Sequence, residues 1–301
     1  MNTLSSKDKS GLKLTMTILA VYAICFLFRC LEYFLIRTDQ TFFGEAFIHK
    51  LLGIAICFVM FWALHIKPTD AGFRVKRIHK NILWGALLGI SVYFLAYGIE
   101  LIIMVAMGKS PSLHFYVTSY SVDGNMGNQT GFWFFVLCIV GNIINVVMEE
   151  GVFRGLFLKI AEKKYNFLIA VIISSVLFGS WHLVAPLRSY FDGERSLGGM
   201  FMIMLMLFFA TGITGAKFCL LTKISGSLWL PMTDHFINNT IVNILHISST
   251  SGIDELQTVR VAIAQTISFI IVLIIFIKGK YYKKPTFESR EIVKENNIEV
   301  L

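Results

Sequence analysis

Two adjacent carboxylates and an arginine in an apolar segment are the residues most able to carry chemistry. Glu149, Glu150 and Arg154 lie in a stretch, 131–160, that is apolar enough to cross a membrane. Ionisable groups at bilayer depth are costly and mark functional sites by default. Glu150 and Arg154 are four residues apart and can neutralise each other on one helix face. Glu149 lies about 100° further round the helix and is free to face another group. The alternative is an ion pair that only locks two helices together.

Three further polar residues stand inside apolar segments downstream. His182 ends the run that begins at Phe178, while His235 and Asn239 are four residues apart and share one helical face. A lone histidine in a membrane helix usually only hydrogen-bonds a neighbouring helix. Together with Glu149, however, these residues come from three separate apolar segments, which favours one shared site.

The chemistry open to such a set is narrow. A glutamate beside a histidine can take a proton from water, and a second histidine with an asparagine amide can stabilise an oxyanion. The sequence has no GxSxG or HExxH motif. The pattern therefore predicts an amide hydrolase that activates water and forms no covalent intermediate. Zinc is the competing use, with Glu149, His182 and His235 as ligands, but asparagine is an uncommon zinc ligand and no cofactor is expected.

The composition indicates a polytopic membrane protein. Of 301 residues, 55% are hydrophobic and only 15% are charged, whereas soluble domains carry about 25% charged residues. Windows of about 20 apolar residues mark membrane spans. Eight are predicted: 14–36, 43–66, 82–107, 131–160, 167–187, 197–221, 228–246 and 259–277. The predicted fold is all-α, a bundle of eight transmembrane helices with an intramembrane active-site cavity.

Basic residues in the loops predict the topology. Lys and Arg are concentrated before the first span and after the second, fourth, sixth and eighth, so both termini are expected in the cytoplasm. The integral membrane domain is predicted at 1–278, followed by a polar cytoplasmic tail at 279–301. A multi-pass protein of the cell membrane is expected, in contact with the lipid bilayer and not with nucleic acid. Within the first span, Arg29 and Glu32 are expected to pair at i, i+3.

Three short motifs occur in order along the chain: EExxxR at 149–154, FxxxH at 178–182 and HxxxN at 235–239. Their flanks are FRG at 153–155 and GSLWLP at 226–231. With these motifs the chain resembles the CPBP family of CAAX proteases and bacteriocin-processing enzymes (also called Abi), which includes the type II CAAX prenyl endopeptidases. The resemblance spans roughly residues 131–245.

The resemblance implies an eight-helix intramembrane bundle whose site opens to the cytosol. It implies that Glu149 and His182 activate water, and that His235 and Asn239 form the oxyanion hole. A glutamate-dependent mechanism without metal fits such a site best.

The same resemblance gives Glu150 and Arg154 a supporting role, in which the pair holds the glutamate helix in place. One residue departs from the pattern, because Asp234 stands where the family typically has a small or apolar residue before the second histidine. This carboxylate could stabilise a charged His235, or it could point away and contact a neighbouring helix. The second interpretation is favoured.

The leading functional prediction is an intramembrane endopeptidase that cleaves a membrane-associated or lipidated peptide. The abundance of Ile, Phe, Lys and Asn indicates an AT-rich bacterial genome, which favours processing of, or immunity to, bacteriocin or pheromone peptides over a prenylated substrate. The alternative is a non-catalytic immunity or scaffold protein that binds a peptide or sensor partner. A transporter is disfavoured because internal repeats and paired broken helices are absent. The oligomeric state is not predicted.

Overall fold

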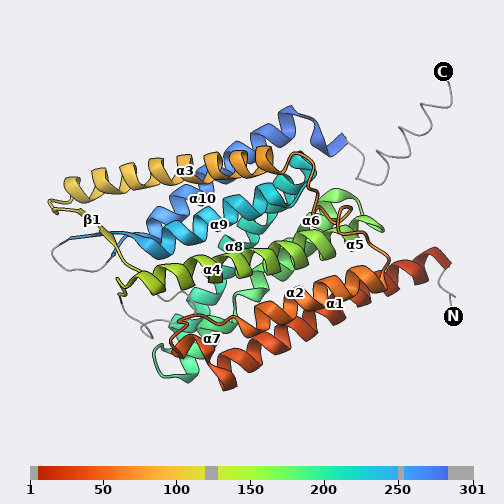
Figure 1. The fold of residues 1–301 in the computed structure, drawn as a ribbon, viewed down its shortest axis with the longest axis horizontal. Helices are drawn as coiled ribbons and strands as arrows, with labels where there is room; N and C mark the ends of the chain where they lie inside the picture. Colours follow the sequence, from red (N-terminus) through yellow and green to blue (C-terminus); the bar gives the residue numbers. More distant parts are fainter. Residues whose placement is uncertain (1–5, 119–127, 250–253, 284–301) are drawn as a thin grey trace.

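The apolar segments form long helices that lie side by side along one axis of the molecule (Figure 1). The structure is a computed structural model, and it describes residues 6–118, 128–249 and 254–283. The α-helices in these ranges are α1 (Ser6–Leu31), α2 (Ile48–Ala63), α3 (Ile78–Ala106), α4 (Phe132–Glu149), α5 (Leu158–Glu162), α6 (Phe167–Trp181), α7 (Val184–Phe191), α8 (Leu197–Ser225), α9 (Trp229–Ile244) and α10 (Gln257–Lys278). The shorter elements are the π-helices η1 (Glu32–Ile36) and η3 (Glu150–Phe157), the 3-10 helices η2 (Thr38–Gln40) and η4 (Tyr281–Lys283), and the strands β1 (Ser112–Phe115) and β2 (Leu245–Ser248).

Within the described ranges, six helical segments are long and apolar enough to cross a membrane. They contain α1, α3, α4 with η3 and α5, α6 with α7, α8, and α10. The predicted spans at 43–66 and 228–246 instead contain α2 and α9, which have 16 residues each, fewer than the roughly 20 that a crossing helix needs. The helical fold class is confirmed, and the count of eight spans remains a prediction for these two segments. The predicted tail lies outside the described residues from 284 onward.

The distribution of side chains is that of a protein surrounded by lipid. Large apolar side chains face outward on most helices: Trp62, Phe94 and Met202 are 80%, 78% and 76% exposed. Soluble monomers rarely expose such extended apolar surface. Arginines, in contrast, are buried in the interior, among them Arg154 and Arg260. Together with the six long apolar helices, this supports a multi-pass membrane protein.

The two ends of the bundle differ. The first turn of α1 and the last turn of α10 lie at the same end, at the right of Figure 1. At the other end β1 and β2 pair antiparallel, with Ser112 opposite Ser248 and Phe115 opposite Leu245. Because β1 follows α3 and β2 follows α9, this pairing joins the ends of those two helices. The two helix ends at the right agree with termini on one side of the membrane, and the cytoplasmic assignment remains a prediction.

Helix α9, which carries the predicted His235 and Asn239, is held close to α3 by glycines. A Cβ added at Gly85 would lie 2.5 Å from the carbonyl oxygen of Leu230, and one added at Gly89 would lie 2.8 Å from the side chain of Ile237. Contacts this short leave no room for a side chain, so glycine is required for this approach of the two helices. The glycines therefore set the position of α9 in the bundle.

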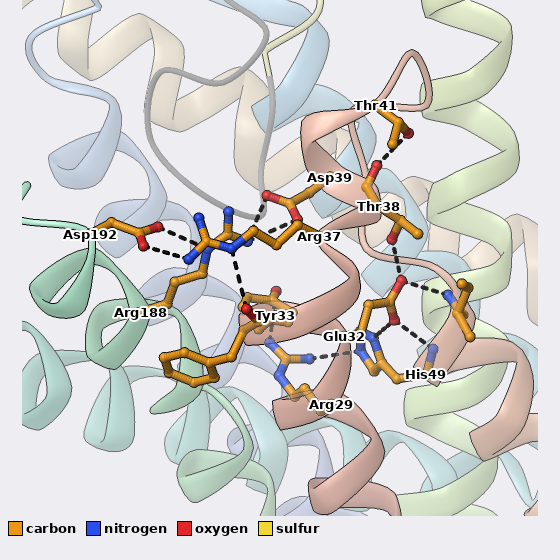
Figure 2. Close-up of polar contacts among 12 residues, drawn as sticks. Arg29, Glu32, Tyr33, Arg37, Thr38, Asp39, Thr41, His49, Arg188 and Asp192 are labelled. Atoms are coloured by element: carbon orange, nitrogen blue, oxygen red, sulfur yellow. Dashed lines mark hydrogen bonds and ion pairs between the residues drawn. The ribbon is translucent and has the colours of Figure 1, made fainter.

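A buried polar cluster joins α1 and η1 to the start of α2 (Figure 2). Glu32 accepts hydrogen bonds from the backbone N–H groups of Ile48 and His49 at 2.9 and 2.6 Å. Its Oε2 also lies 2.5 Å from His49 Nδ1, while His49 Nε2 accepts from Arg29 at 3.2 Å. The predicted direct pair of Arg29 with Glu32 is therefore wrong. The carboxylate turns instead to the first N–H groups of α2, which have no partner within their own helix, and the imidazole lies between the two charges.

Arg188 of α7 anchors the loop after α1 (Figure 2). Its Nη1 donates to both carboxylate oxygens of Asp39 at 2.8 Å, and its Nε donates to Asp192 at 3.1 Å. Asp192 also accepts from Arg37 at 2.6 Å. Burial acts to raise the pKa of Asp192, but the hydrogen bonds from Arg37 and Arg188 outweigh it, so the pKa is lower than that of an ordinary aspartate.

Candidate active site

The helix that carries the two glutamates widens into a π-helix immediately after Glu149. The π segment, Glu150–Phe157, is buried at every position. Gly155 allows the wide turn to pack closely, since a Cβ there would lie 3.2 Å from the side chain of Leu228. Ser174 of α6 donates a hydrogen bond to the carbonyl oxygen of Phe153 at 2.9 Å. π turns within α-helices are rare and are frequent at functional sites.

Both glutamates contact the same imidazole. Glu150 Oε1 lies 2.9 Å from His235 Nδ1, and Glu149 Oε2 lies 3.7 Å from His235 Nε2. Glu150 Oε1 also accepts from Arg154 Nη1 at 3.1 Å, so the expected i, i+4 ion pair is present. All four side chains are buried. Glu149 is thus turned toward α9, and the two carboxylates lie at opposite nitrogens of one ring.

His182 lies at the end of α6, beside the same group. Its Nδ1 donates to the carbonyl oxygen of Phe178 at 2.8 Å, which leaves Nε2 of the neutral ring as an acceptor. The Phe178 ring contacts both histidines edge to face, with centroid distances of 4.9 Å to His182 and 6.4 Å to His235. Glu149 is near enough to both imidazoles to interact with them electrostatically. The structure therefore brings together Glu149, His182 and His235 from α4, α6 and α9.

Asn239 lies one turn after His235 on α9. Its Oδ1 accepts a hydrogen bond from Asn238 Nδ2 at 2.8 Å, so the Nδ2 group of Asn239 points elsewhere. Among the described residues, Asn239 Nδ2 makes no hydrogen bond. An amide that presents its N–H₂ group can stabilise a developing oxyanion.

Asp234 does not contact His235. Its Oδ2 forms an ion pair with Nζ of Lys217 on α8 at 2.6 Å, although the angle is not that of a hydrogen bond. Both side chains are buried. The prediction that this carboxylate contacts a neighbouring helix is confirmed. His235 is held instead by Glu150 and by the ring of Phe218, which stacks on the imidazole at 4.7 Å.

The arrangement restricts what His235 can do. A carboxylate oxygen only accepts hydrogen bonds, so the contact with Glu150 places a proton on Nδ1. Nε2 can then donate a hydrogen bond only if the ring is protonated on both nitrogens.

Neither the predicted active-site cavity nor the alternative metal set is confirmed for these residues. A cavity of about 1010 Å³ lies along α3, α10 and the end of α8, and none of the four predicted catalytic residues lines it. Its lining includes four basic residues: Arg74, Lys76, Arg77 and Lys80. Among the described residues, no three or more His, Cys, Asp or Glu side chains form a group that could hold a metal ion. An active-site cavity and metal independence both remain predictions.

Comparison with known proteins gives a family for the segment that carries the site. Residues 131–241 match the family described as "Type II CAAX prenyl endopeptidase Rce1-like". This segment contains all three motifs. The predicted resemblance to the CAAX-protease family is confirmed. A curated relative, "Putative membrane peptidase YdiL" of Bacillus subtilis (strain 168), is 26% identical over 199 residues, which are 64% of this chain and 68% of that protein. The two findings support a peptide hydrolase of the membrane.

Some contacts of the site were not predicted from the sequence. The bond from His235 to Glu150 depends on the wide turn of η3, which 3.6-residue periodicity does not reveal. Lys217 lies near the end of the predicted span 197–221, where a basic residue indicates only the membrane boundary, and it is buried and pairs with Asp234. Nothing in the sequence marks Asn238 as part of the site, except that it is polar and precedes Asn239.

Proposed function

We propose that this chain is an intramembrane endopeptidase that hydrolyses a peptide bond of a membrane-associated peptide. The observation that supports this most is the buried contact of Glu149 and Glu150 with the two nitrogens of His235. Two buried carboxylates at one imidazole are costly to maintain in a membrane helix bundle. Their arrangement fits the chemistry of activating water and stabilising an oxyanion.

In the proposed reaction, Glu149 and His182 act on a water molecule and take one of its protons. His182 Nε2 is suited to this task because its Nδ1 proton is held by a backbone carbonyl. The hydroxide attacks the carbonyl carbon of the peptide bond, and the carbonyl oxygen becomes an oxyanion. His235 and Asn239 donate hydrogen bonds to that oxyanion. When the intermediate collapses, the C–N bond breaks and the proton taken from water passes to the leaving amine nitrogen.

The supporting pair has two tasks in this proposal. Arg154 neutralises Glu150 at the π turn, and Glu150 in turn holds Nδ1 of His235. The bond from Nδ1 to Glu150 fixes the orientation of the ring, so that Nε2 is the nitrogen that faces Glu149. No metal ion takes part in this reaction.

For the substrate, we propose a bacterial peptide such as a bacteriocin or pheromone precursor, reached from the cytoplasmic side of the plasma membrane. The similarity to a bacterial protein named as a membrane peptidase supports this choice. The description of the family matched by residues 131–241 names a CAAX prenyl endopeptidase, so prenylated peptides belong in the same assay.

The test is peptide cleavage by the purified, detergent-solubilised protein, read by mass spectrometry. The probes are two sets: prenylated peptides with CAAX ends, and unprenylated amphipathic bacterial precursors. Wild type is compared with Glu149→Gln, with and without a strong zinc chelator. The matched control is Glu100→Gln, because Glu100 is also a buried carboxylate in an ion pair, with Arg260, and lies outside the candidate site.

We expect cleavage by wild type and Glu100→Gln, loss with Glu149→Gln, and no effect of the chelator. Cleavage that is lost with the chelator and restored by zinc would instead make the buried histidines and a carboxylate metal ligands. If no probe is cleaved while Glu149→Gln supports the same cellular phenotype as wild type, the protein acts as a non-catalytic immunity or scaffold protein.

A further inference from the structure

A chain of hydrogen bonds runs from a buried lysine to the predicted oxyanion hole. Lys217 Nζ donates to Gln265 Oε1 at 2.8 Å, and Gln265 Nε2 donates to Asn238 Oδ1 at 2.7 Å. Asn238 Nδ2 then donates to Asn239 Oδ1 at 2.8 Å. The residues come from α8, α10 and α9, so three helices have to pack correctly to form this series of hydrogen bonds.

The direction of this chain is fixed at its first residue. An ammonium group has three donors and no acceptor, so Gln265 has to turn its oxygen toward Lys217 and its N–H₂ group toward Asn238. The Asn238 oxygen accepts this bond and a second one from the hydroxyl of Tyr93. Its own N–H₂ group can then only face Asn239.

The same reasoning fixes the amide of Asn239. If its side chain were flipped, two N–H₂ groups would face each other at the Asn238 contact and neither would be satisfied. The partner that Asn238 offers therefore holds the Asn239 oxygen and leaves the N–H₂ group of Asn239 available, in the proposed reaction, to the reacting carbonyl. An oxygen in that place would repel an oxyanion.

Lys217, the first residue in this series of hydrogen bonds, has further partners that hold it in place. Lys217 is 1% exposed, and it contacts Ser268 Oγ at 3.2 Å as well as Asp234. Hydrogen bonds that follow one another in a buried, low-dielectric setting polarise each other. A cation at the head of such a chain makes the last N–H groups better donors.

We propose that Lys217, Gln265 and Asn238 are positioning residues that hold the Asn239 amide in the orientation that donates to the oxyanion. This inference rests on the proposed function, and it adds Gln265, which lies outside the matched segment 131–241. It also gives Asp234 a task, which is to keep Lys217 in place.

The test uses near-isosteric substitutions that change one donor into an acceptor. Asn238→Asp cannot donate to Asn239, and Gln265→Glu cannot donate to Asn238. Each is measured in the full-length protein with whichever of the two peptide probe sets wild type cleaves. Loss of one oxyanion-hole donor costs about 10²–10³ in kcat, and we expect each variant to lose about 10- to 100-fold in kcat with KM within about twofold. The matched control is Gln257→Glu, because Gln257 is also on α10 but donates to the carbonyl of Val242. Its kcat should equal that of wild type.

The decisive comparison repeats Asn238→Asp and Gln265→Glu in an Asn239→Ala background. If both act only through Asn239, neither lowers kcat further there, because effects of residues that work as a unit are not additive. A general loss of structure would lower kcat by the same factor in both backgrounds, and that result would overturn the proposal. Thermal unfolding of each variant reports such a loss independently of activity.

The outcomes separate this inference from the proposed function. If Glu149→Gln and Asn239→Ala both cleave the probe like wild type, the proposed function is wrong, and the positioning role that rests on it is wrong as well. If those two variants are impaired while Asn238→Asp and Gln265→Glu cleave normally, only the positioning role is wrong.

Discussion

Removing Glu150 should damage stability and catalysis by separate routes, and a second substitution can tell them apart. Glu150 Oε1 accepts hydrogen bonds from Arg154 and from His235. Glu150→Ala leaves the guanidinium of Arg154 buried beside the Phe178 ring, at 4.1 Å from its centroid. Within the described residues, Nε and Nη2 of Arg154 already have no hydrogen-bond partner. The variant would therefore contain a buried cation with no carboxylate partner.

The size of the effect follows from the geometry. At a separation of 3.1 Å, two unit charges in a medium of effective dielectric constant near 20 attract each other by roughly 5 kcal/mol. Breaking a buried pair by removing one partner costs about 3–5 kcal/mol, or roughly a 150- to 4000-fold change in the folding equilibrium at 1.4 kcal/mol per factor of ten. Glu150→Ala combined with Arg154→Met removes the uncompensated cation as well. Replacing a buried pair by apolar groups is often neutral, so the double variant should be within about 2 kcal/mol of wild type.

Catalysis should not recover in the double variant. His235 Nδ1 still lacks its carboxylate partner, so the ring orientation that the oxyanion role requires is no longer held. The assay is reversible unfolding in mixed micelles, followed by tryptophan fluorescence, alongside cleavage of the probe peptide. Stability restored without activity is the expected result. Two results would refute the reasoning: a double variant as unstable as Glu150→Ala, or one that regains wild-type cleavage.

Three further predictions concern packing, pH and metal. Gly85→Ala should destabilise the protein and lower its yield, because the new Cβ would meet a backbone carbonyl of α9 at 2.5 Å, whereas Gly98→Ala on the same helix meets nothing within 4 Å and should be neutral or gain up to about 1 kcal/mol. Since the pKa of Asp192 is lowered in the folded state, its ion pairs with Arg37 and Arg188 contribute stability above the ordinary aspartate value of 3.8, and this contribution is lost as the pH falls through the lowered pKa. Thermal unfolding of wild type and Asp192→Asn between pH 6 and pH 3 measures this contribution. The difference in stability between the two proteins should be smaller at pH 3 than at pH 6, and a difference that does not change with pH would contradict the prediction. Wild-type cleavage should survive dialysis against a zinc chelator, and metal analysis of the purified protein should find less than one zinc per chain.

The sequence predicted the candidate site better than it predicted the contacts within it. Glu149, His182 and His235 stood out because polar residues are rare in apolar spans, and that rarity does not depend on knowing how the helices pack. The partner of each residue does depend on packing. Arg29 and Glu32 are close in sequence, but the Glu32 carboxylate accepts hydrogen bonds from the backbone N–H groups at the start of α2 instead of pairing with Arg29.

Long-range pairs were beyond prediction for the same reason. Glu100 stands alone in its span, yet it meets Arg260, which is 160 residues away in the chain. The length of α9 was also overestimated, because its apolar pattern continues into β2, where the backbone becomes extended and pairs with β1. A hydropathy window does not distinguish a helix from a short strand that continues it.

The fastening of α9 to α3 has a consequence for how a peptide could reach the site. Glycine contacts hold the two helices together near the start of α9, and strand pairing joins them after its end. A peptide that passed between α3 and α9 would have to break both. Among the described residues, side-chain hydrogen bonds join α9 to α4, from Asn142 Nδ2 to Thr240 Oγ1 at 3.2 Å and from Asn243 Nδ2 to Asn142 Oδ1 at 3.5 Å. This seam between α9 and α4 is also where His235 meets the glutamates. A peptide admitted there from the bilayer would spread the site as it entered, so that cleavage would have to wait until the seam had closed around it.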